Sequence, residues 1–86
     1  VGGIILNTES MTAELNNVIL PLNKKEYDLL KFFMENAGKA LSRDKILAAV
    51  WGYESGETRT LDNHVARLRK LGVKIETVFG VGYKFN

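Results

Sequence analysis

Short apolar segments alternate with turn-forming residues near the start of the chain, which predicts a small antiparallel sheet. Residues 4–6 form an apolar strand, and the polar cluster at 7–10 is a turn. Met11, Ala13 and Leu15 then alternate with polar residues, at the period of a half-buried second strand.

A hairpin with a third strand follows directly. Asn16 and Asn17 suit a two-residue hairpin turn, because asparagine tolerates positive φ. The apolar segment 18–20 then resumes as a strand. Pro21 cannot donate a hydrogen bond to a sheet ladder, so we expect this strand at an edge or ending there.

The pattern changes to helical spacing after residue 22. Asn23 as N-cap, with Glu26 three residues later, predicts a capping box at the start of the first helix. Gly38 is expected to end this helix as its C′ glycine. The apolar positions that recur along it are Tyr27, Leu29, Leu30, Phe33 and Met34.

A second and a third helix are predicted before a final hairpin. Ser42 caps the second helix, and Gly52 ends it; its apolar face is formed by Ile46, Leu47, Val50 and Trp51. The polar segment 53–58 is a loop. The third helix covers about 59–71 and is closed by Gly72. The hairpin pairs residues 73–78 with 83–85 across a glycine-containing turn.

This order of elements predicts one α+β domain over residues 1–86 with the layout of a winged helix-turn-helix. We expect an N-terminal antiparallel sheet at about 3–22, a core of three helices at about 23–72 and a β-hairpin wing at about 73–86. In a winged helix, one helix reads the DNA major groove and the wing touches the neighbouring backbone or minor groove.

The third helix carries an apolar stripe and a polar face. Leu61, Val65 and Leu68 lie on one side of a helical wheel, with His64 and Leu71 beside them. The opposite side presents Arg59, Asn63, Ala66 and Lys70, with Thr60 and Arg67 on one flank and Asp62 and Arg69 on the other. Arginine pairs with guanine, asparagine pairs with adenine, and a small alanine allows close approach. Asp62 is expected to orient Arg59 or Arg69, or to accept from cytosine.

Charge is distributed unevenly along the chain, although the net charge is only +2. Residues 1–58 hold six lysines and arginines against eight acids, whereas residues 59–86 hold six against two. A basic C-terminal third is the electrostatic signature expected of a polyanion-binding surface.

Composition excludes several classes of function. The chain has no cysteine and only one histidine, His64, so it has no disulfide, no thiol nucleophile and no closed Cys/His zinc site. We predict no catalytic residue, cofactor or metal, and no enzymatic activity. The longest apolar stretch is too short for a membrane span, and no signal peptide is evident, so we expect a cytoplasmic location. The absence of a start methionine suits a fragment of a longer chain.

Four blocks in order along residues 22–85 resemble the winged-helix effector domain of OmpR/PhoB-type two-component response regulators. Residues 22–30 (LNKKEYDLL) and 41–52 (LSRDKILAAVWG) are similar to its first two helices. Residues 59–70 (RTLDNHVARLRK) resemble its recognition helix, and residues 75–85 (IETVFGVGYKF) resemble its wing. The third and fourth blocks are the most specific for this family.

The resemblance implies bacterial transcriptional regulation, with residue roles carried over by position. The implied base-reading residues are Thr60, Asp62, Asn63 and Arg67. The implied DNA-backbone contacts are Trp51, Arg59, His64, Arg69 and Lys70. In the wing, the implied contacts are Gly80, Gly82 and Lys84. The loop that contacts RNA polymerase in some members corresponds here to Tyr53, Glu54, Ser55, Gly56 and Glu57.

The resemblance also implies partners. We expect double-stranded DNA, homodimers on direct repeats, an upstream phosphorylated receiver domain and, in some members, RNA polymerase.

Two residues and one connecting segment depart from the family pattern. Phe79 stands where the family usually has an arginine that enters the minor groove, and Ala66 stands where relatives are often basic. The connection 71–73 between helix and wing is shorter than usual. Together with the low net charge, Phe79 and Ala66 leave open an alternative: a winged helix used for protein–protein contact.

Overall fold

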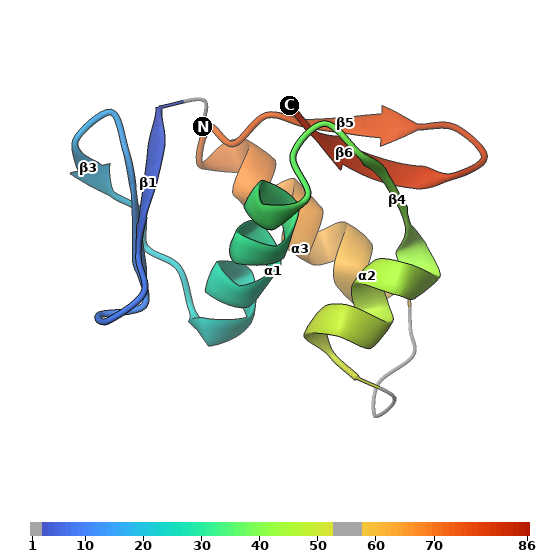
Figure 1. Cartoon of the computed structure of the whole chain (residues 1–86), viewed down its shortest axis with the longest axis horizontal. Helices are drawn as coiled ribbons and strands as arrows, with labels where there is room; N and C mark the ends of the chain where they lie inside the picture. The colour runs from blue at the N-terminus through green and yellow to red at the C-terminus, as the bar shows by residue number, and fades with distance from the viewer. Residues whose placement is uncertain (1–2, 53–57) are drawn as a thin grey trace.

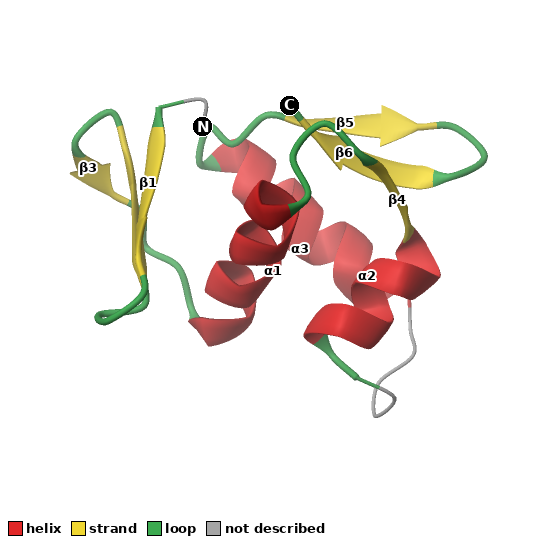
Figure 2. Cartoon of the chain, in the orientation of Figure 1, coloured by secondary structure: helices red, strands yellow, loops and turns green. Residues whose placement is uncertain are grey.

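The computed structural model describes residues 3–52 and 58–86 and has the predicted α+β architecture, with three helices between two antiparallel sheets (Figures 1 and 2). The elements in chain order are β1 (Ile4–Asn7), β2 (Thr12–Leu15), β3 (Val18–Ile19), α1 (Lys24–Glu35), β4 (Ala40–Ser42), α2 (Arg43–Val50), α3 (Thr58–Lys70), β5 (Ile75–Val78) and β6 (Gly82–Phe85).

The N-terminal sheet has the order β1-β2-β3 and confirms most of its prediction. Asn16 and Asn17 form the hairpin turn with φ of 51° and 69°. Strand β3 lies at the edge, as Pro21 requires. The prediction for Met11 was wrong: with a φ of 56° this residue is an exposed turn residue, because β2 begins only at Thr12.

Capping explains where α1 and α2 begin. The Asn23 side chain accepts from the Glu26 backbone N–H (2.8 Å), and Glu26 Oε1 accepts from the Asn23 N–H (2.9 Å), as a capping box requires. Ser42 Oγ caps α2 by accepting from the Lys45 N–H at 3.1 Å. Gly38, however, is not the C′ residue of α1, because the helix is capped at Asn36.

The C-terminal sheet contains a strand that the sequence did not predict. Strand β4 pairs with β6, so the order is β4-β6-β5 and the wing is three-stranded. Gly82 lies opposite Ser42 in this sheet and is buried. A Cβ atom there would collide with the Leu41 carbonyl oxygen and lie 3.0 Å from the Arg43 nitrogen. Glycine at position 82 therefore permits β6 to approach β4.

The core lies among the three helices and takes in residues of both sheets. Leu61, Val65 and Leu68 of α3 are completely buried. The largest fully buried side chains of the core are Phe33 and Phe85. Gly72, with a φ of 101°, ends α3 in a Schellman motif: its N–H donates to the Arg69 carbonyl, and the next N–H donates to the Leu68 carbonyl. This motif turns the chain sharply into the short connection that precedes the wing.

Replacing Gly82 with alanine should lower the free energy of unfolding by about 3 kcal/mol, because the added methyl group must push β6 away from β4. Urea denaturation measures the change. Gly80→Ala is the matched control: Gly80 has a φ of 78° but open space around it, so only the backbone penalty of about 1–2 kcal/mol applies. Equal losses in the two variants would contradict the close-approach argument.

Candidate nucleic-acid interface

The two faces of α3 divide as the helical wheel predicts. Its apolar stripe is buried in the core, and the opposite side exposes Arg59, Asn63, Ala66 and Lys70 to solvent. Among the described residues, no hydrogen bond or ion pair engages the side chains of Arg59, Asn63 or Lys70. These three groups are therefore available to an external partner.

Asp62 of α3 contacts both α2 and the wing. Its Oδ1 accepts from Arg43 Nε at 3.1 Å and from the Tyr83 hydroxyl. The expectation that Asp62 orients Arg59 or Arg69 was wrong, because residues from outside α3 occupy this carboxylate oxygen. Asp62 thus links the recognition helix to the elements on either side of it.

The groups around Asp62 favour its charged form. Burial acts to raise its pKa, but the hydrogen bonds from Tyr83 and Arg43, together with the Arg43 charge, outweigh burial and lower the pKa of Asp62 from its ordinary value. Burial and the bond to Asp62 raise the pKa of Tyr83, so its hydroxyl stays protonated as a donor. The hydrogen bond with Asp62 is also the main cause that raises the pKa of Arg43.

Arg69 fastens the wing to α3. Its Nε and Nη2 both donate to the Ile75 carbonyl (2.9 and 2.7 Å), and Nη2 also donates to Thr77 Oγ1 at 2.9 Å. The guanidinium lies 5.5 Å from the centre of the Tyr83 ring, and Arg43 lies 5.0 Å from the same ring. Arg69 is thus engaged with the wing.

Arg67 reaches back to the start of α1. Its Nη2 donates to the Pro21 carbonyl at 3.1 Å, and its Nε lies 3.4 Å from Glu26 Oε2. Glu26 is the buried acid of the capping box, so one side chain both caps α1 and holds Arg67. A base contact by Arg67 requires release from these partners.

His64 and Trp51 pack together beside the exposed face. Their rings meet edge to face at 5.0 Å, and the Trp51 side chain is half-buried against the core, in agreement with the packing role its helical position favours. His64 Nδ1 lies 2.8 Å from the Thr60 carbonyl, which can only accept. Nδ1 therefore donates, and in the neutral ring Nε2 has no proton to offer a phosphate.

The predicted wing residues have different surroundings. Gly80 is exposed in the turn, whereas Gly82 is buried against β4. Lys84 is half-buried and pairs across the sheet with Glu76 and Ala40. The predicted polymerase-contact loop, Tyr53 to Glu57, lies outside the described residues.

Sequence reasoning missed Tyr83 and Lys25 as positioning residues. Tyr83 is buried and its hydroxyl donates to Asp62; a tyrosine in an apolar strand could have suggested a need for such a polar partner. Lys25 Nζ donates to the Val50 carbonyl at the end of α2 (2.9 Å) and lies 5.9 Å from the Trp51 ring. A lysine in the first turn of another helix gives no local signal of this contact.

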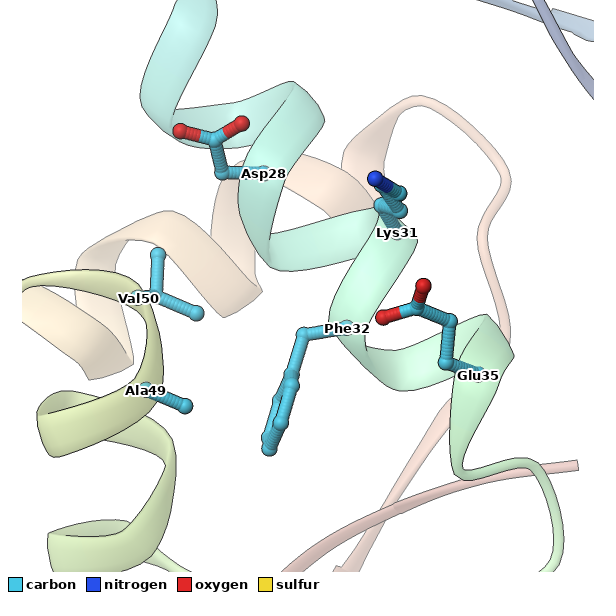
Figure 3. A pocket seen from close by; sticks show the side chains of 6 residues that line it. All are labelled: Asp28, Lys31, Phe32, Glu35, Ala49 and Val50. Atoms are coloured by element: carbon cyan, nitrogen blue, oxygen red, sulfur yellow. The ribbon is translucent and has the colours of Figure 1, made fainter. Parts of the chain in front are cut away.

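A shallow cavity of about 200 Å³ lies between α1 and α2, and no residue of α3 lines it (Figure 3). It is lined by Asp28, Lys31, Phe32, Glu35, Ala49 and Val50. Within residues 3–52 and 58–86, no cluster of three or more metal-ligating side chains occurs. Over the same ranges, no helix has the length and hydropathy to cross a membrane.

Comparisons with known proteins give a consistent result. Residues 16–85 match the family model described as "Transcriptional regulatory protein, C terminal". Transcriptional regulatory protein VxrB of Vibrio cholerae is 43% identical over 92% of this chain and 34% of its own length. Response regulator SaeR of Staphylococcus epidermidis is 35% identical over 96% of this chain and 40% of its own length. The chain therefore spans well under half of these curated relatives.

A solved structure extends the likeness to three dimensions. The DNA-binding domain of Klebsiella pneumoniae RstA, in complex with the RstA box, superposes with a TM-score of 0.85 at 26% identity and covers 98% of this chain and 91% of that one. Fold and interface together define a winged-helix DNA-binding domain of a transcriptional regulator. The chain belongs to the OmpR/PhoB-type family of response-regulator effector domains, as its sequence motifs predicted. That family comprises DNA-binding regulators rather than enzymes.

Asp62→Asn should destabilise the protein at neutral pH, because asparagine keeps the shape of the side chain but loses the charge that pairs with Arg43. The folded-state pKa of Asp62 is below its unfolded value, so its contribution is present above about pH 4 and is lost as pH falls through the folded pKa. Urea midpoints of both proteins at pH 7 and below about pH 3 test this expectation. A gap that stays constant between the two pH values would contradict it.

Proposed function

We propose that this domain binds double-stranded DNA sequence-specifically, with α3 in the major groove and the wing alongside. The observation that carries the proposal is the face of α3 opposite the buried stripe, where Arg59, Asn63 and Lys70 are exposed and unengaged by described residues. An α-helix fits the major groove, and these side chains supply both base-reading and phosphate-binding chemistry.

Base reading is assigned to Asn63, Arg67 and Thr60. Asn63 can pair bidentately with adenine, and Arg67 with guanine once it leaves Glu26 and Pro21. Thr60 flanks the same face, where a hydroxyl can donate or accept. For Asp62, its bonds to Arg43 and Tyr83 support a positioning role over the base contact that the resemblance implies.

Arg59 and Lys70, at the two ends of the exposed face, are the primary phosphate contacts. Trp51 and Arg69 support the phosphate contacts by positioning their neighbours. The Trp51 ring packs edge to face against His64, and Arg69 is bonded to the wing. His64 donates to a phosphate only when its ring carries a second proton. Lys84 and the backbone of Gly80 supply the wing contacts, while Gly82 lets β6 pack closely against β4.

The wider role follows from the family. We propose that residues 1–86 are one domain, the effector part of a longer cytoplasmic regulator with an upstream receiver domain and no catalytic activity of its own. It binds direct repeats as a homodimer and contacts RNA polymerase through residues 53–57. The competing function is a protein-interaction module, which the exposed Ile5 and Ile19 on the N-terminal sheet favour.

Salt dependence separates the two functions. Four to six neutralised phosphates should give a slope of log K against log salt of about −4 to −5 for each protomer. Fluorescence anisotropy with a duplex selected from a random pool, between low and moderate salt, measures this slope. A slope near zero, or no binding at low salt, would refute DNA binding and support the protein-interaction module.

Two substitutions on α3 should behave differently. Arg67→Ala should cost about 1–3 kcal/mol on the selected duplex and relax preference at one base pair. Lys70→Ala should weaken all duplexes alike and make the salt slope less steep by about 0.9. Because Arg67 also binds Glu26, unfolding curves must accompany the binding data. Unchanged sequence preference in a folded Arg67→Ala variant would show that the helix is oriented differently.

A further inference from the structure

The tip of the wing presents an aromatic side chain to solvent. Phe79 is 92% exposed and Val81 is 45% exposed. A tight turn holds them there: the Val81 N–H donates to the Val78 carbonyl at 3.0 Å, and Gly80 takes a φ of 78°. Figure 1 shows this turn extending away from the helices at the far end of the β5–β6 hairpin.

The tip carries no charge that could bind phosphate. Residues 77–83 contain no lysine, arginine, aspartate or glutamate. The nearest cation along the chain on this side is Lys84, which is half-buried within the sheet. Apolar and stacking contacts are therefore the chemistry that the Phe79 side chain offers to a partner.

The wing is attached to one flank of α3, so the β5–β6 hairpin has a fixed orientation relative to that helix. Arg69 and Asp62 form one flank of that face, and both are bonded to the wing, Arg69 to Ile75 and Thr77 and Asp62 to Tyr83. The buried Gly82 holds β6 against β4 on the other side. When α3 enters a groove, these contacts keep the hairpin and its uncharged tip attached to the helix that binds the DNA.

We propose that Phe79, supported by Val81, acts as an apolar wedge that inserts between base pairs in the minor groove next to α3 and bends the duplex. The inference rests on the DNA-binding function proposed above. Apolar wedges of this kind unstack a base step and kink DNA by about 20–90°. Because pyrimidine–purine steps unstack most easily, Phe79 also sets a sequence preference at a position that α3 does not touch.

DNA is the partner that the surroundings of the tip favour. The face of α3 beside the wing ends in Lys70 and begins at Arg59, and the whole segment 59–86 has an excess of positive charge. A polyanion brought to that face meets the tip in the same encounter. A protein partner is the other outcome of the test below.

The experiment uses the 86-residue chain and duplexes selected from a random pool, prepared with a single site or with two sites in direct repeat. Bending is followed by energy transfer between dyes at the duplex ends, and unstacking by 2-aminopurine placed at the expected step. The variants are Phe79→Ala and Phe79→Arg. Ile19→Ala is the matched control, because Ile19 is an apolar residue, 64% exposed, on the opposite sheet.

Phe79→Ala should abolish the bend and the 2-aminopurine signal and weaken binding about tenfold, with an unchanged salt slope. Phe79→Arg should steepen the slope by about 0.9 without restoring the bend. Ile19→Ala should match the unaltered chain in every measurement.

Different results would overturn the wedge. If Phe79→Ala binds and bends the single-site duplex like the unaltered chain, the wedge is wrong while DNA binding by α3 stands. If Phe79→Ala is impaired only on duplexes with two sites, the tip contacts a second protomer instead of a base step. If the unaltered chain shows no salt-dependent binding at all, the proposed function itself fails, and the wedge fails with it.

Discussion

The burial of one stripe of α3 determines most of this structure. Leu61, Val65 and Leu68 have no exposed surface and belong to one buried cluster with residues of α1, α2 and both sheets. Removing such side chains from water is the largest favourable contribution that a small domain has. Since the stripe must face inward, the opposite side of the same helix must face outward. The exposed polar face is therefore a direct consequence of how the core forms.

The wing depends on a second, polar constraint. The Asp62 carboxylate accepts from Tyr83 on β6 and from Arg43 on α2, and Arg69 binds the backbone of β5. These bonds fix the angle between hairpin and helix, which apolar packing alone would leave adjustable. Hydrogen bonds that involve ionised groups are short and strong, so they hold these elements in a defined geometry. The tip of the wing thus has a defined position relative to the exposed face of α3.

Positive charge in the C-terminal third serves two purposes. Arg67 and Arg69 are bonded within the protein, to Glu26 and Ile75 among others, whereas Arg59 and Lys70 have no hydrogen bond or ion pair among the described residues. A count of basic residues therefore overstates the charge that is free to meet DNA. Because Arg59 and Lys70 have no partner among the described residues, the exposed face of α3 is cationic although the net charge of the chain is only +2.

Local signals in the sequence determined where most elements begin and which side of each faces the core. Asn23 and Ser42 cap their helices, the two asparagines at 16 and 17 form the hairpin, and the period of α3 separates its buried and exposed faces. These features depend on residues within a few positions of one another, so a pattern can reveal them. Apart from Met11 and the end of α1, such predictions were confirmed.

Only the tertiary structure decided the partners of the charged side chains and the existence of β4. Asp62 meets Arg43 and Tyr83 from other elements, and Arg67 reaches a carbonyl 46 positions away. Strand β4 has three residues, too few to show a period, and forms because β6 returns beside it. Such contacts join segments that are remote in the chain, and hydrophobic periodicity carries no information about them. Folding therefore decided which cations of α3 remain free.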